Sequence, residues 1–397
     1  MLLSLALGII LALVLGRICE KIKIPRIIGM IITGIVLGPF VLNLFDSKLL
    51  EISGELRKIA LIIILLKAGL SLDIKDLIKV GRPAILLSFL PATLEIIGYT
   101  IMAPNIFDIP IVEAALMGTV LAAVSPAVVV PRMVNLIENR IGTRKAIPQM
   151  ILAGSSLDDV FVIVLFTTFL NFTLNDVFSY TNLLNIPISI VMGILLGAVI
   201  GMALFFLFEY RFKKNNHIRN SEKVIIILAT AFFLVSLEEL LKNKVPISGL
   251  LAVLSMAITL KIKSTTLVTG RLSEKIGKLW IGAELILFIL VGAAVDIRFT
   301  FNSGVGVLLI IFTTLIFRFI GVSFSISHTG LDKEEKVFCL FSYLPKATVQ
   351  AAIGTIPLTM GIKSGSIILS VAVVSILITA PIGAFLMDRT AVKFLEK

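Results

Sequence analysis

The run QMILAGSSLDDVFVIVLFTTFL, residues 149–170, is apolar along most of its length but contains two adjacent aspartates. A helix that crosses a bilayer needs about 20 mainly apolar residues, so this run is long enough to span. Asp158 and Asp159 lie near its middle. An ionised carboxylate at that depth is costly and marks a functional site. Two acids side by side indicate a site that binds a cation, a proton, or both in turn.

The composition of the whole chain agrees with this reading, since 58% of the residues are hydrophobic and only 15% are charged. Such values exclude a soluble globular domain and predict a polytopic membrane protein. We expect an all-α fold of about 13 transmembrane helices, because a helix satisfies its own backbone groups in lipid. The apolar segments are 2–16, 25–45, 59–72, 83–104, 110–131, 149–170, 186–209, 222–241, 246–262, 279–297, 304–327, 337–358 and 364–387.

The basic residues predict the orientation of these spans. With the N-terminus outside, 26 of the 36 Lys and Arg residues fall in inside connections or the C-terminal tail, and seven fall outside. Cytoplasmic connections carry such an excess. We therefore expect a plasma-membrane protein with a cytoplasmic C-terminus. Its net charge of +11 needs no nucleic acid, and its inner basic loops suit anionic lipids.

Two of the predicted spans contain proline in the middle. The segment 110–131 includes Pro126 and Pro131, and the segment 337–358 includes Pro345. Proline lacks a backbone donor and clashes with the preceding turn, so we expect each helix to break. Broken backbone at membrane depth is tolerated inside protein or beside a water-filled cavity.

The polar residues around these breaks suggest an internal repeat. Glu95 precedes Pro126 by 31 residues, and Arg318 precedes Lys346 by 28. The first repeat would consist of the spans 83–104, 110–131 and 149–170. The second would consist of the spans 304–327, 337–358 and 364–387, inverted in the membrane. Inverted repeats with a broken helix in each half are typical of secondary transporters, whose site lies where the breaks meet. Two broken spans can also arise by chance.

Candidate cation ligands lie around the aspartates and the first break. Ser155 is four residues before Asp159 and therefore on the same helix face. Its hydroxyl suits a hard cation, which prefers oxygen ligands. Beside Pro126, Val124 offers a freed carbonyl and Ser125 a hydroxyl. The alternatives are that the acids only form structural salt bridges and that Pro126 only kinks its span.

The buried basic residues need anionic partners. Arg318 keeps its charge and therefore needs a permanent partner, for which Asp158 is our candidate. Glu95 is the expected partner of Lys346 because of their positions in the repeat. This second pair is either structural or directly involved in transport.

The strings AVSPAVVVP, GSSLDDV and PKATVQAAIG, with the spacing between them, resemble the sodium/proton antiporter B subfamily of the cation/proton antiporter superfamily. The resemblance covers nearly the whole chain and implies a thirteen-span homodimer. It implies a mobile core formed by residues 83–170 and by residues 301–397, which include a short cytoplasmic tail. The core would move against a dimerisation scaffold of residues 1–82 and 171–300, which include a linker helix.

The resemblance also implies roles for single residues. Asp159 would carry the cation and the proton in turn, with Asp158 as its partner, and both would be metal ligands for Na⁺ or Li⁺. Glu95 and Lys346 resemble the core ion pair of the subfamily. Arg318 stands where electrogenic relatives have a lysine.

Two positions depart from the electroneutral branch of the superfamily. That branch has Asn before the carrier aspartate and an acidic residue at the first break, where this chain has Asp158 and Ser125. The number of ions exchanged per proton therefore stays open at this point.

The function expected from these features is exchange of Na⁺ or Li⁺ for H⁺ by alternating access, without enzymatic activity or a cofactor. Exchange of K⁺ for H⁺ is the alternative within transport, and a membrane ion sensor or channel is the alternative from another class. An intramembrane aspartyl protease needs aspartates on two helices and a GxGD motif, whereas these aspartates are adjacent and GxGD is absent from the sequence.

Overall fold

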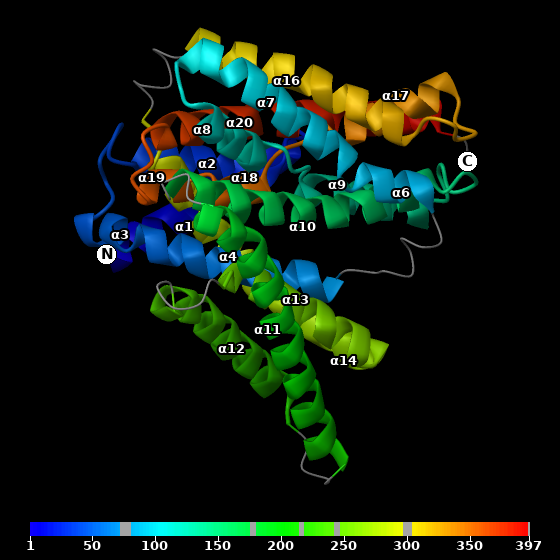
Figure 1. Ribbon diagram of the computed structural model, residues 1–397. Coiled ribbons are helices and arrows are strands. Elements are labelled where there is room, and N and C mark those ends of the chain that lie inside the picture. The colour runs from blue at the N-terminus through cyan, green and yellow to red at the C-terminus, as the bar shows by residue number, and fades with distance from the viewer. Residues whose placement is uncertain (72–80, 175–179, 214–217, 242–246, 297–303, 396–397) are drawn as a thin grey trace. The chain divides into compact units, whose positions relative to one another are not determined.

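The computed structural model of the chain describes residues 1–71, 81–174, 180–213, 218–241, 247–296 and 304–395. These residues form helices, with no strand among them (Figure 1). Each of the thirteen predicted segments contains at least one helix within its described part. Nine helical stretches among the described residues are long and apolar enough to cross a membrane. The predicted all-α polytopic class is therefore confirmed.

The chain divides into two compact units. The first comprises the described residues of Met1–Gly54, Asp73–Thr173 and Leu287–Lys397, and the second those of Glu55–Leu72 and Leu174–Ile286. Both aspartates and both expected breaks belong to the first unit. The described residues of the expected core, 83–170 and 301–397, lie in this unit, which also includes residues 1–54.

The first unit is built from the helices at both ends of the chain and those around the aspartate pair. They are α1 (Leu2–Lys21), α2 (Arg26–Leu37), α3 (Ser47–Glu51), α6 (Arg82–Leu87), α7 (Leu90–Phe107), α8 (Ile111–Leu121), α9 (Pro126–Glu138), α10 (Ile147–Leu174), α16 (Gly304–Ser325), α17 (Lys333–Ser342), α18 (Thr348–Ile353), α19 (Ile356–Thr359) and α20 (Gly365–Phe394).

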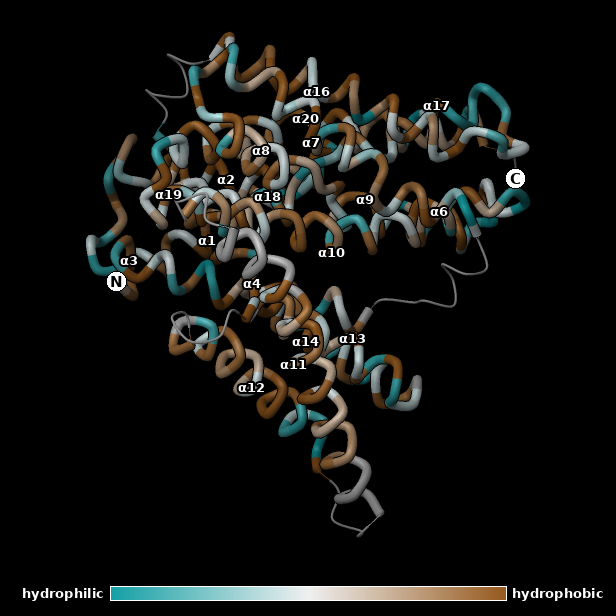
Figure 2. Tube along the Cα trace, in the orientation of Figure 1, coloured by the Kyte–Doolittle hydropathy of each residue, from teal (hydrophilic) through white to brown (hydrophobic). Residues whose placement is uncertain are grey.

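The second unit consists of helices from the middle of the chain. They are α4 (Ser53–Ser71), α11 (Tyr180–Lys213), α12 (Asn220–Leu241), α13 (Gly249–Lys263) and most of α14 (Thr266–Ala293). Hydrophobic residues run along these helices, as they do in the first unit (Figure 2). Helices of this composition suit a lipid environment.

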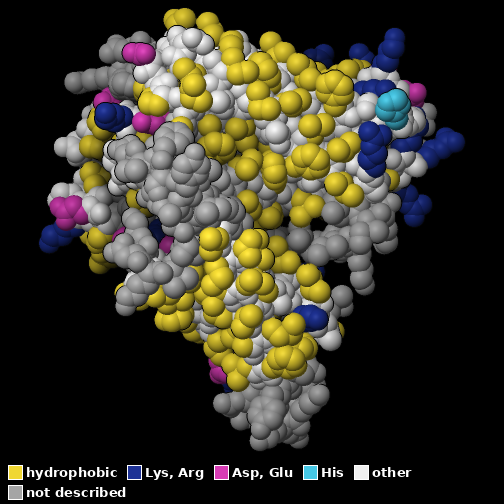
Figure 3. Space-filling model, in the orientation of Figure 1, with side chains coloured by type: hydrophobic (Ala, Val, Ile, Leu, Met, Phe, Trp, Pro, Cys, Tyr) yellow, Lys and Arg dark blue, Asp and Glu magenta, His cyan; other side chains and the backbone are white. Residues whose placement is uncertain are grey.

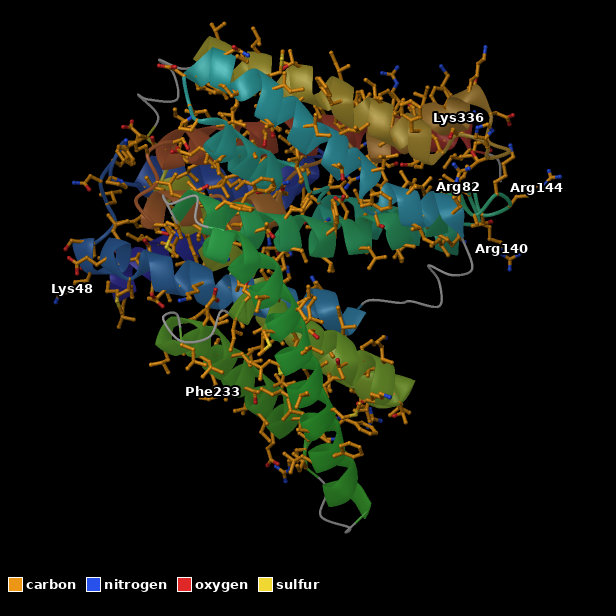
Figure 4. All side chains as sticks on the ribbon, in the orientation of Figure 1. Lys48, Arg82, Arg140, Arg144, Phe233 and Lys336 are labelled. Atoms are coloured by element: carbon orange, nitrogen blue, oxygen red, sulfur yellow. The ribbon has the colours of Figure 1, made fainter. Side chains whose placement is uncertain are left out.

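Charged side chains gather at the two ends of the first unit. Arg82, Arg140, Arg144 and Lys336 lie at one end, and Lys48 lies at the other (Figure 4). On the face shown in Figure 3, hydrophobic side chains cover much of the surface between these ends. The sequence places the first four residues in connections on one side of the membrane and Lys48 on the opposite side. Residues that the sequence assigns to opposite sides of the membrane thus lie at opposite ends of this unit.

A close contact between α7 and α16 positions the first buried charges. A Cβ on Gly98 of α7 would lie 2.9 Å from Cγ of Phe317, and one on Gly321 of α16 would lie 2.6 Å from Cα of Pro91. Glycine therefore allows the two helices to approach closely at both places. Glu95 and Arg318 lie between these contacts, one on each helix.

Candidate functional site

The first predicted helix break is present between α8 and α9. Helix α8 ends at Leu121 and α9 begins at Pro126, which leaves residues 122–125 as buried, non-helical backbone. Pro126 suits the first position of a helix, because an N–H there would lack a helical partner. Pro131, the second proline of this span, lies inside α9. The break therefore forms at Pro126 alone.

The second predicted break separates α17, which ends at Ser342, from α18, which begins at Thr348. Pro345 lies within it. The Ser125 N–H of the first break donates to the Pro345 carbonyl, with a nitrogen–oxygen distance of 2.8 Å. The two breaks thus meet directly, as expected from the repeat.

The buried side chain of Gln350 joins the same two segments. Its Nε2 donates to the Ala123 carbonyl at 2.6 Å, and its Oε1 accepts from the Ala347 N–H at 2.8 Å. One amide thus satisfies backbone groups of both breaks. Our site prediction omitted Gln350, although it is a polar residue in the quoted PKATVQAAIG string.

Four fully buried charged side chains meet beside the breaks. Glu95 Oε1 lies 2.6 Å from Lys346 Nζ, which is the expected ion pair. Glu95 Oε2 lies 2.6 Å from Arg318 Nη1, whereas Asp158 Oδ2 is 3.7 Å from Arg318 Nη2. The expected Arg318–Asp158 ion pair is therefore present, but Glu95 is the nearer carboxylate. The contact between α7 and α16 explains why.

Both cations also cap the broken helix α8. Arg318 donates to the Ala122 carbonyl and, through Nε, to the Tyr343 carbonyl. Lys346 donates to the Leu121 carbonyl. Carbonyls at a helix C-terminus carry partial negative charge, which a cation stabilises. Arg318 thus connects the two breaks through its hydrogen bonds and connects the two repeats through its ion pair with Glu95.

The aspartate pair lies next to the first break. Asp158 Oδ2 accepts from the Val124 N–H at 2.7 Å, so the amide of Val124 contacts the aspartate pair, whereas the sequence pointed to its carbonyl. Asp159 is 5% exposed, and the structure records no ion pair between it and another described residue. The Ser155 hydroxyl donates to the Leu152 carbonyl of its own helix at 3.2 Å.

Several buried oxygens around the pair have no hydrogen-bond partner among the described residues. They are Asp158 Oδ1, Asp159 Oδ1 and Ser125 Oγ. A buried polar atom normally has a partner, and each exception calls for an explanation. Carboxylate and hydroxyl oxygens are suitable ligands for a small hard cation. The donor set therefore fits a cation that is bound and released as cargo.

Comparison with known proteins agrees with this chemistry. The family model described as "Sodium/hydrogen exchanger, transmembrane" matches residues 8–391. Sodium/hydrogen exchanger 9B2 of Xenopus tropicalis is 32% identical, and the match covers 96% of this chain and 72% of that protein. The human 9B2 protein is 31% identical, with coverage of 97% and 74%.

A solved structure shares the fold. The sodium proton antiporter MjNhaP1 from Methanocaldococcus jannaschii, determined at pH 8, aligns with a TM-score of 0.82 at 21% identity. The alignment covers 98% of this chain and 97% of that one. The predicted antiporter fold is therefore confirmed.

Proposed function

Because this chain belongs to the sodium/hydrogen exchanger family and exchanges Na⁺ for H⁺, we propose that Asp159 carries both ions in turn. Asp158, Ser125, Ser155 and the Val124 carbonyl complete the site. The observation that carries this proposal is the pair of buried carboxylates with unpartnered oxygens beside two meeting helix breaks. Lithium would use the same oxygens.

The charge balance of the site explains why a single carrier is sufficient. Glu95, Asp158 and Asp159 supply three negative charges, and Arg318 and Lys346 supply two positive ones. Buried charge is stable only when it is compensated. One Na⁺ or one proton neutralises the remaining charge, and the two occupants therefore exclude each other. Exchange follows when the site faces each side of the membrane in turn.

We propose that the core, residues 83–170 and 301–397, moves as a body against the scaffold formed by residues 1–82 and 171–300 in a homodimer. The placement of the described core residues in one compact unit supports their movement together, and residues 1–54 of the proposed scaffold belong to the same unit. The proposed setting is the plasma membrane, with the N-terminus outside and the basic loops beside anionic inner-leaflet lipids.

Sodium-driven proton movement in sealed proteoliposomes tests the exchange itself. We expect Na⁺ and Li⁺ gradients to drive protons in the opposite direction, each at a rate that saturates with ion concentration. The same measurement with K⁺ in place of Na⁺ distinguishes the proposed exchange from the alternative exchange of K⁺ for H⁺. An ion flux without a coupled proton flux would indicate a channel and contradict the proposed function.

The apparent KM for Na⁺ should rise as the pH falls. A protonated carboxylate cannot hold Na⁺, so protons compete with the cation for Asp159. The measurement is the Na⁺ dependence of exchange at several pH values across about two pH units. An apparent KM that does not change with pH would show that the two ions bind to separate sites.

Exchange should be electroneutral, with one cation moved per proton. Arginine keeps its charge throughout the cycle, and Arg318 lies between Glu95 and Asp158. Asp158 therefore stays paired and has no proton to contribute. A potassium diffusion potential imposed on the proteoliposomes should leave the rate and end-point of exchange unchanged. A dependence on voltage would contradict electroneutral exchange and point to Lys346 as a second proton donor.

A further inference from the structure

A side chain in each repeat holds the backbone of the helix break in the same repeat. In the first, Asp158 on α10 accepts from the Val124 N–H at 2.7 Å, across 34 residues. In the second, Thr379 Oγ1 on α20 accepts from the Lys346 N–H at 3.0 Å, across 33 residues. Both acceptors lie on the third span of their repeat, and both donors lie in the break of the second span.

Other contacts relate the repeats in the same way. Glu95 and Arg318 occupy the first span of each repeat and pair with each other at 2.6 Å. The two breaks pair through the Ser125 N–H and the Pro345 carbonyl. Thr379 is therefore the counterpart of Asp158 in the second repeat. A neutral hydroxyl replaces the carboxylate there, so it holds the backbone without adding charge.

The surroundings of Thr379 suit this role. It is buried, and its hydroxyl donates to the Ser375 carbonyl at 2.7 Å. A hydroxyl can donate one hydrogen bond and also accept through its lone pairs, so Thr379 can accept from the Lys346 N–H while it donates to Ser375. One turn further along α20, a Cβ on Gly383 would lie 2.6 Å from Cγ of Pro345. Helix α20 thus lies directly against the second break.

We propose that Thr379 is a positioning residue for exchange. Its oxygen fixes the backbone at Lys346, and the ammonium group of Lys346 then reaches both Glu95 and the Leu121 carbonyl. Without this bond, the Lys346 N–H loses its acceptor and the ammonium group shifts relative to Glu95. The positive charge of Lys346 would then lie in a different place relative to the aspartate pair. This inference rests on the proposed function of the site.

The test compares Thr379→Val, which keeps the shape but removes the acceptor, with Thr379→Ser, which keeps the acceptor. Thr390→Val is the matched control, because Thr390 lies on the same helix and its hydroxyl donates to the Leu386 carbonyl of that helix. Exchange is measured per folded protein in proteoliposomes against pH and Na⁺ concentration. Alanine at both positions provides the same comparison if a valine variant does not fold.

We expect Thr379→Val to lower the maximal rate about tenfold, because the Lys346 ammonium group is no longer held in position beside Glu95. Its pH profile should also shift, which a loss of stability alone would not cause. Thr379→Ser should restore both, and Thr390→Val should match the unmodified protein. A Thr379→Val variant with the rate and pH profile of Thr390→Val would overturn the inference. No exchange by the unmodified protein would overturn the proposed function instead.

Discussion

Asp159→Asn is expected to abolish exchange and leave a folded protein. The amide is nearly the same size as the carboxylate, but it neither titrates nor carries the charge that attracts a cation. The substitution also removes the surplus negative charge of the site, so neither Na⁺ nor a proton is needed for neutrality. Sodium-driven proton movement in proteoliposomes should fall to the level of protein-free vesicles, while the thermal melting curve keeps a single cooperative transition.

Asp108→Asn is the matched control for this variant. Asp108 is exposed in the turn after α7 and has left-handed backbone with φ of 52°, a conformation that asparagine also tolerates. The same chemical change there should leave exchange intact. Substantial exchange by a folded Asp159→Asn protein would show that another group carries the ions.

The features that could be predicted from the sequence have local causes. An apolar run of spanning length predicts a helix wherever it lies in the fold, and Pro126 and Pro345 interrupt a helix through their own ring geometry. For this reason both breaks, and the Asp158–Asp159 pair that lies between them in the chain, could be located from the sequence. Pro131 shows the limit of this rule, because a proline inside a span can also be accommodated within a helix.

The pairing of the buried charges depends instead on packing between distant segments. Arg318 meets Glu95 across 223 residues because glycines let α7 and α16 approach closely. The positions in the repeat predicted that Glu95 pairs with Lys346, but they could not show that this one carboxylate pairs with two cations. Thr379 gives no local signal either, since a threonine in an apolar helix is common and its acceptor role depends on where the break lies.

Glu95→Gln should destabilise the protein more than any other single change in this cluster. Glu95 binds Arg318 and Lys346, each at 2.6 Å, and all three side chains are fully buried. Removing one partner of a buried ion pair costs about 3–5 kcal/mol, because the remaining charge loses its compensation. Here two cations lose their nearest carboxylate at once. We expect the melting temperature to fall by more in Glu95→Gln than in Lys346→Gln, which leaves Glu95 paired with Arg318.

The double variant Glu95→Gln with Lys346→Gln separates this arrangement from a general loss of packing. Removing the lysine as well takes away one of the stranded cations, so the double variant should lose less stability than the two single losses combined. Glu274→Gln is the control, because Glu274 pairs with Lys278 at 2.7 Å on an exposed helix surface. Exposed pairs contribute only about 0–1 kcal/mol, and its melting temperature should barely change. Strict additivity of the two buried substitutions would contradict the shared carboxylate, since each charge would then be compensated by a separate partner.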